Sequence, residues 1–151
     1  MKEAEYERIT YGVTMAVAET LSRLNPQMTF IYVSGAGTDI SEHGRVMWAR
    51  VKRRTENALL RLPFRAVYMF RPSIVQPVQG VKSKTALYRF FYAFTKALLP
   101  VLRWALRAYV LTTEQVGRAM LVVARRGAST RVLESRDISA LSEVFPGRER
   151  M

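Results

Sequence analysis

The chain has 151 residues, of which 49% are hydrophobic, so we expect one folded domain with a real core rather than a disordered segment. It contains no cysteine, which excludes disulfides, thiolate nucleophiles and cysteine-ligated zinc and fits a reducing, cytoplasmic compartment. The single histidine, His43, leaves no imidazole cluster for a metal, so no metal site is expected. The polar start MKEAEYERIT is unlike a signal peptide, and no uncharged run approaches the ~20 residues of a membrane-spanning helix.

The formal net charge of +12 is unevenly distributed along the chain. Between Gly44 and Thr113, lysine and arginine are frequent and Glu56 is the sole acid. Such a field attracts polyanions such as nucleic acid, anionic lipid or nucleotide phosphates, and it also simply keeps a protein in solution. Charge alone does not choose among these uses.

The first half of the chain alternates between helix and strand patterns. Residues 2–24 predict a helix, and the nearly continuous apolar run at 28–34 predicts a strand buried on both faces. After a loop rich in Gly, Thr, Asp and Ser, residues 45–61 predict a second helix and 66–70 a second buried strand. The first helix carries one apolar stripe, formed by Ile9, Val13, Val17, Leu21 and Leu24.

The second half begins with a longer helical pattern over 84–109, in which Pro100 marks a kink or break. Thr112 and Gln115 form a capping box that opens a helix to about Arg126. The remaining expected elements are a loop over 73–83, a weaker strand over 131–134 and a short last helix capped by Asp137.

This alternation predicts an α/β fold with a mostly parallel sheet and covering helices. We expect a single domain over 1–144, followed by a tail at 145–151. Three strands are few for this architecture, and the pattern starts with a helix. It is therefore typical of the C-terminal part of a doubly wound, Rossmann-like domain whose first nucleotide-binding strands are missing.

Three segments carry a resemblance to a known family: FIYVSGAG at 30–37, the spacing Trp48-x-x-x-Lys52, and YMFRPSIVQP at 68–77. In this order they resemble the C-terminal half of a short-chain dehydrogenase/reductase of the extended or atypical branch, the NAD-dependent epimerase/dehydratase family. The resemblance covers about residues 5–126. It implies a Rossmann sheet and NAD or NADP as cofactor, although no residue before position 28 matches the family's glycine-rich fingerprint.

The resemblance also implies three catalytic positions. In the family a tyrosine transfers a proton, a lysine four residues later lowers its pKa and holds the nicotinamide ribose, and a serine orients the substrate carbonyl. Lys52 matches the lysine, Ser34 is the candidate serine, and Trp48 stands in place of the tyrosine. Because indole offers only an N–H donor, Trp48 cannot carry the proton. Each residue also has a non-catalytic alternative. Lys52 can be a solvated surface residue, and Trp48 can be a helix residue packed on the sheet, which is the favoured role for it.

The turn after the second predicted strand lies beside the nicotinamide in the resembled family. Pro72, Ser73 and Val75 are the matching cofactor-binding positions, while Pro72 also ends the strand. Gly35-Ala36-Gly37 lies too late in the pattern to be a phosphate cradle, so these glycines are expected to form a tight turn.

Tyr32, Tyr68 and His43 are further candidates for supplying the proton. Tyr32 and Tyr68 fall inside predicted strands, where packing is the expected role. His43 lies in the loop beside the expected cleft, where an isolated histidine is usually solvated, and Asp39 suits a cap or turn.

Residues 82–110 contain a basic amphipathic helical segment. It can cover a substrate pocket, lie weakly on an anionic membrane, or dock its apolar face on the domain, the commonest case. Its basic stripe is Lys82, Arg89, Lys96 and Arg103, and its apolar stripe is Leu87, Phe91, Phe94, Leu98 and Leu102. No nucleic-acid-binding motif is present, so no specific nucleic-acid partner is expected.

The sequence therefore predicts a truncated relative of the NAD(P)-dependent epimerases and oxidoreductases with impaired catalysis. An apolar sheet edge would be covered by another copy, as a homo-oligomer, or by a separate nucleotide-binding half. The alternative is a non-catalytic binding module that associates with a partner chain or an anionic membrane surface through its basic helix.

Overall fold

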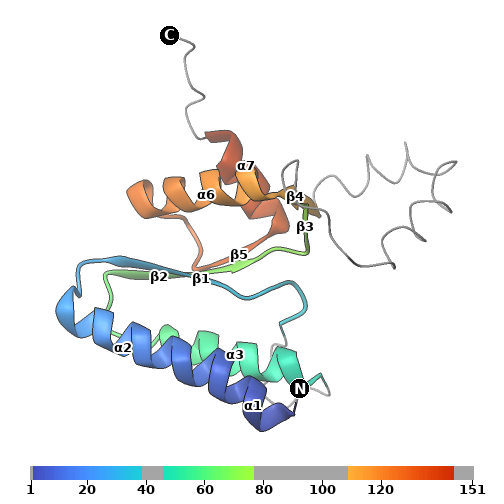
Figure 1. Ribbon diagram of the computed structural model, residues 1–151. Coiled ribbons are helices and arrows are strands. Elements are labelled where there is room, and N and C mark those ends of the chain that lie inside the picture. Colours follow the sequence, from blue (N-terminus) through green and yellow to red (C-terminus); the bar gives the residue numbers. More distant parts are fainter. Residues whose placement is uncertain (1, 39–45, 77–108, 145–151) are drawn as a thin grey trace, which may run out of the picture.

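The computed structural model describes residues 2–38, 46–76 and 109–144 and arranges them in three layers (Figure 1). A sheet lies in the middle, the first long helix and α3 cover one face, and α6 and α7 cover the other. The helices are α1 (Glu3–Glu7), η1 (Arg8–Val13), α2 (Thr14–Leu24), α3 (Met47–Leu59), α6 (Thr113–Arg126) and α7 (Ser135–Val144). The strands are β1 (Thr29–Val33), β2 (Ala66–Arg71), β3 (Ile74–Gln76), β4 (Val110–Thr112) and β5 (Val132–Glu134).

The central sheet is parallel and has the strand order β1-β2-β5. Thr29 pairs with Ala66 and Val33 with Phe70, so β1 and β2 start and end together. The predicted α/β class is confirmed, with a parallel sheet that is Rossmann-like in class. A separate pair of parallel strands, β3 and β4, was not predicted, because three-residue strands have too little length to show a pattern.

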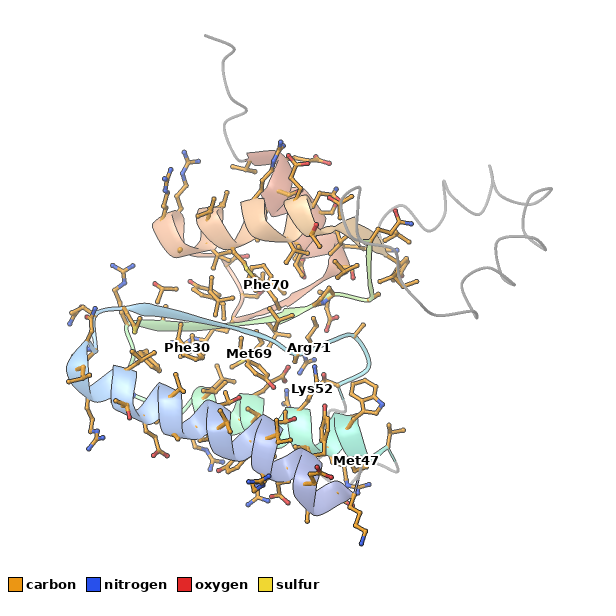
Figure 2. The ribbon with its side chains drawn as sticks, in the orientation of Figure 1. Phe30, Met47, Lys52, Met69, Phe70 and Arg71 are labelled. Atoms are coloured by element: carbon orange, nitrogen blue, oxygen red, sulfur yellow. The ribbon has the colours of Figure 1, made fainter. Side chains whose placement is uncertain are left out.

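The side chains of β2 alternate between the two helical layers, as the period of a strand requires. Met69 packs with Leu59 and Ala18 on the side of α2 and α3, whereas Phe70 packs with Leu111 and Val123 on the side of α6. Figure 2 shows Met69 and Phe70 on opposite sides of the sheet. The sheet therefore has a hydrophobic cluster on each face, and β2, its middle strand, is nearly all buried.

The first long helix runs from α1 through the π-helical turns of η1 into α2. Its buried residues are Met15, Ala18 and Ser22. The apolar stripe seen in the sequence faces outward instead, with Val13 57% and Val17 50% exposed. The helix therefore packs through its other face, and the stripe is uncovered among the described residues.

Most predicted boundaries are confirmed. Thr112 and Gln115 form both hydrogen bonds of the capping box at the start of α6. Asp137 caps the start of α7 by accepting the Glu134 N–H at 2.9 Å. The expectation that the first strand is buried on both faces is wrong: β1 is only partly buried, because it is an edge strand of the described sheet. The 82–110 segment lies almost wholly outside the described residues, as does the 145–151 tail.

Candidate functional site

The candidate site lies where β1 and β2 end side by side. Hydrogen bonds continue beyond the strands, from Ser34 N–H to the Phe70 carbonyl at 2.9 Å and from Ala36 N–H to the Pro72 carbonyl at 3.0 Å. The loops that follow the two strands are thus held together. In open parallel sheets, ligands bind at the carboxyl ends of the strands, which makes this the place to look for one.

Lys52 on α3 reaches this edge of the sheet. Its ammonium group donates a hydrogen bond to the carbonyl oxygen of Ser34, and its side chain is partly buried. Burial lowers the pKa of Lys52, while the charge of Glu56 one turn further along α3 opposes that shift. Figure 2 shows Lys52 extending toward the end of the sheet near Arg71. An ammonium group has three donors, so two remain beyond the bond to Ser34.

The side chain of Ser34 is buried and turned into the protein. Its hydroxyl donates to Oε1 of Glu56 at 2.5 Å, and the residue is only 7% exposed. A hydroxyl whose proton is held by a buried carboxylate is poorly placed to donate to a substrate carbonyl. Ser34 is therefore bonded to Lys52 through its backbone carbonyl, whereas its hydroxyl is bonded to the buried carboxylate of Glu56.

Glu56 and Arg71 form a buried ion pair in this region, and the sequence pattern did not predict it. Glu56 is fully buried on α3, and Arg71, at the end of β2, donates to Oε1 from Nε at 2.9 Å and to Oε2 from Nη2. Arg71 also reaches Glu134, at the end of β5, through Nη1 at 3.4 Å. One sequence signal was available: Glu56 is the only acid in a long basic stretch.

The charges of this pair are mutually stabilised. Burial favours the neutral form of Glu56, but hydrogen bonds from Arg71 and Ser34, together with the charge of Arg71, hold its pKa below the ordinary value. The hydrogen bonds to Glu56 raise the pKa of Arg71, although burial opposes this. Glu56 is thus ionised near neutral pH, and neither group is a proton donor in that range.

The three candidate cofactor-binding residues fall in two places. Pro72 is buried directly after β2, and the N–H of Ser73 donates to the hydroxyl of Ser135 at 2.8 Å. That hydroxyl in turn donates to Oγ of Ser73 at 3.0 Å, so the turn is joined to the start of α7. Val75 is exposed in β3, away from the central sheet. Pro72 and Ser73 therefore share the edge with Ser34, whereas Val75 belongs to the smaller sheet.

Trp48 occupies the first turn of α3 and is 37% exposed. The tip of its ring, Cη2, lies 3.8 Å from the position that a Cβ would take on Gly37. Packing of Trp48 on the sheet stays a prediction. The ring lies against the loop after β1, one helical turn from Lys52.

Neither strand tyrosine replaces the missing phenol. Burial, with the nearby Tyr6, raises the pKa of Tyr32 to about 12, which opposes phenolate formation. Tyr68 lies within β2, paired with Ile31, and its hydroxyl accepts the Ala128 N–H at 3.1 Å. Asp39 and His43 lie outside the described residues.

The loop after β1 is a turn, as the glycines predicted. Gly37 has a φ of 78°, and both the N–H and the hydroxyl of Thr38 donate to the Gly35 carbonyl, the hydroxyl at 2.7 Å. Because the N–H of Ala36 is bonded to Pro72, two amides of this loop are already occupied. That arrangement does not suit a phosphate cradle.

No family model matches the chain, and a search of curated proteins finds no match. The structure shows a small α/β fold with a three-stranded parallel sheet. Within residues 2–38, 46–76 and 109–144, no group of three His, Asp or Glu side chains could hold a metal ion. In the same ranges no helix has the length and apolar character needed to cross a bilayer.

Proposed function

We propose that this chain is a relative of the short-chain dehydrogenases and epimerases that holds the nicotinamide end of NAD(H) or NADP(H). One observation carries the proposal: the Lys52 ammonium group is anchored to the Ser34 carbonyl where β1 and β2 end. Its two remaining donors suit the hydroxyls of a nicotinamide ribose. The sequence resemblance assigns the same lysine the same task.

The described residues fit one end of the cofactor only. Lys52, with Pro72 and Ser73 on the adjoining turn, would hold the nicotinamide riboside, and the bound nicotinamide would supply hydride transfer. The described residues contain no glycine-rich turn suited to the pyrophosphate, because in the loop after β1 the amides of Ala36 and Thr38 are already bonded to backbone carbonyls. We propose that a separate nucleotide-binding chain completes the site along β1, whose outer edge has no hydrogen-bonded strand among the described residues.

We propose that proton transfer is impaired in this chain. The indole of Trp48 donates a hydrogen bond but carries no titratable proton near neutral pH. Tyr32 holds its proton to about pH 12. Lys52, whose pKa is lowered by burial, would then serve mainly to bind and orient.

The test is a fluorescence titration with NADH and NADPH in a Trp104→Phe background, which leaves Trp48 as the only tryptophan. Saturable quenching that Lys52→Ala weakens about tenfold or more would support the proposal, since hydrogen bonds to charged groups are this strong. Arg61→Ala, in the turn that follows α3, is the matched control and should bind as the parent does. Absence of saturation, or equal losses in both variants, would contradict cofactor binding.

A second candidate function, a non-catalytic binding module, is favoured by the exposed stripe of the first helix. Ile9, Val13, Val17 and Leu24 are all about half exposed or more. Antiparallel pairing with a second copy would place the exposed Glu5 of one chain opposite Arg23 of the other, so charge and apolar surface would both match. Contact with an anionic membrane through 82–110 rests on the sequence alone.

A further inference from the structure

A cavity of about 360 Å³ lies at the opposite end of the sheet from Lys52, where β1 and β2 begin. Its polar lining includes Arg65, Arg125 and Arg126, together with Thr29 and Tyr68, and no carboxylate lines it. Figure 1 shows the end of α6 above the starts of β1 and β2, on the side away from β3 and β4. The volume falls near the lower end of ligand pockets, roughly 300–1,000 Å³.

The three arginines of the lining come from two parts of the fold. Arg65 precedes β2 and donates to the hydroxyl of Thr29 at 3.2 Å, while Arg125 and Arg126 form the last turn of α6. In the part of the chain that the structure describes, none of the three forms an ion pair. Stabilising the carbonyl end of a helix is the ordinary role of arginines such as Arg125 and Arg126. That role does not account for Arg65, which faces the same cavity from the strand side.

Two lining residues of the cavity, Gly127 and Tyr68, lie close together. Gly127 ends α6 with a φ of 76°, and a Cβ there would lie 3.0 Å from the Tyr68 hydroxyl. That hydroxyl accepts the Ala128 N–H, and its own proton has no acceptor among the described residues. The cavity thus offers one hydroxyl donor beside three unpaired cations.

We propose that this cavity binds a small phosphorylated ligand carrying at least two negative charges. Guanidinium groups match phosphate oxygens in geometry and charge, and the Tyr68 hydroxyl adds a neutral donor. The walls formed by Ala66 and Val123 suit a ligand with a compact apolar or uncharged body. A concave site of this size favours such a ligand over the extended backbone of a nucleic acid, which flat basic surfaces bind.

The test is calorimetric titration of the full chain with pyrophosphate. We expect saturable binding that Arg125→Gln/Arg126→Gln weakens about tenfold or more, because each charge-assisted bond contributes that much. The matched control, Arg54→Gln/Arg118→Gln, also removes two positive charges but lies outside the cavity, and should bind nearly as the parent does. Tyr68→Phe removes only the hydroxyl and should weaken binding by a smaller factor. Circular dichroism confirms that each variant is folded.

Three outcomes would overturn the proposal. The first is absence of saturable pyrophosphate binding by the folded parent chain. The second is an equal loss in the control pair, which would indicate non-specific attraction to a basic protein. The third is tighter binding of an oligonucleotide that depends on the same arginines, which would assign the surface to nucleic acid. Lys52→Ala should leave pyrophosphate binding unchanged, so this site and the proposed dinucleotide function fail or succeed separately.

Discussion

Arg71 and Glu56 meet inside the protein, with Nε and Nη2 of the arginine donating to the two carboxylate oxygens. The pair joins the middle strand to α3, and Ser34 adds a third hydrogen bond from the end of β1. Glu56 is fully buried and Arg71 is 8% exposed, so each charge depends on the other. Three elements are held together at the edge where Lys52 lies.

Removing one member of this pair should be costly. Glu56→Ala removes the buried carboxylate and leaves the Arg71 guanidinium with only its longer contact to the exposed Glu134, and we expect a loss of about 3–5 kcal/mol in the free energy of unfolding. Urea denaturation measures it. Glu114→Ala breaks only the exposed pair with Arg118, so it should cost about 0–1 kcal/mol. Similar losses in the two variants would contradict a structural role for the buried pair.

The same pair should give stability a specific acid dependence. The pKa of Glu56 is lower in the folded than in the unfolded protein, so its contribution is fully present above the unfolded value, about 4.3. It is lost as the pH falls through the lower, folded value. At neutral pH the free energy of unfolding of Glu56→Gln should be lower than that of the parent. In urea denaturations at a series of pH values, this difference should shrink below about pH 4. A deficit that stays constant throughout the acid range would argue against this linkage.

Replacing Trp48 with the tyrosine that the resembled dehydrogenases carry tests the relation between this position and Lys52. The two residues are one helical turn apart, so in Trp48→Tyr the phenol should lie near the Lys52 ammonium group. We expect that phenol to titrate below its ordinary pKa of about 10 in ultraviolet absorbance titrations. Adding Lys52→Gln should remove the shift. A phenol that titrates identically with and without Lys52 would show that the two groups do not interact.

Gly117 inside α6 and Gly127 directly after it should respond oppositely to replacement by alanine. Gly127 has a φ of 76°, which strains any other residue, and a Cβ there would lie a tight 3.0 Å from the Tyr68 hydroxyl, so Gly127→Ala should destabilise the protein by about 1–3 kcal/mol. Gly117 lies inside the helix with open space around it. Gly117→Ala should therefore stabilise by about 0.5–1 kcal/mol. Thermal unfolding of both variants measures the contrast, and shifts in the same direction would contradict it.

The exposed stripe of the first helix should control self-association. Val17→Asp places a charge in the middle of the stripe without disturbing the buried face of Met15, Ala18 and Ser22. If two copies pair through this helix, sedimentation should show the parent as a dimer and this variant as a monomer. Leu121→Asp, on an exposed position of α6, is the control and should leave the assembly unchanged.

Local patterns were sufficient to predict β1, α3, β2, α6 and β5, because each has several residues of consistent periodicity or a cap. They were insufficient for β3 and β4, whose three-residue pairing is visible only in three dimensions. The outward direction of the Val13 and Val17 stripe was also not predictable, since periodicity shows that a stripe exists but not what covers it. Arg71 and Glu56 were missed as a pair for a similar reason: their side chains meet across elements.

The parallel order of the central sheet has a consequence for how the protein forms. Pairing of Val33 with Phe70 can occur as soon as the first half of the chain has been synthesised. The second neighbour of β2 begins only at Val132, so that strand waits for most of the remaining polypeptide. Long-range contacts of this kind slow folding. On the ribosome, α2, β1, α3 and β2 can therefore assemble as an early nucleus, with one flank of β2 open until β5 emerges.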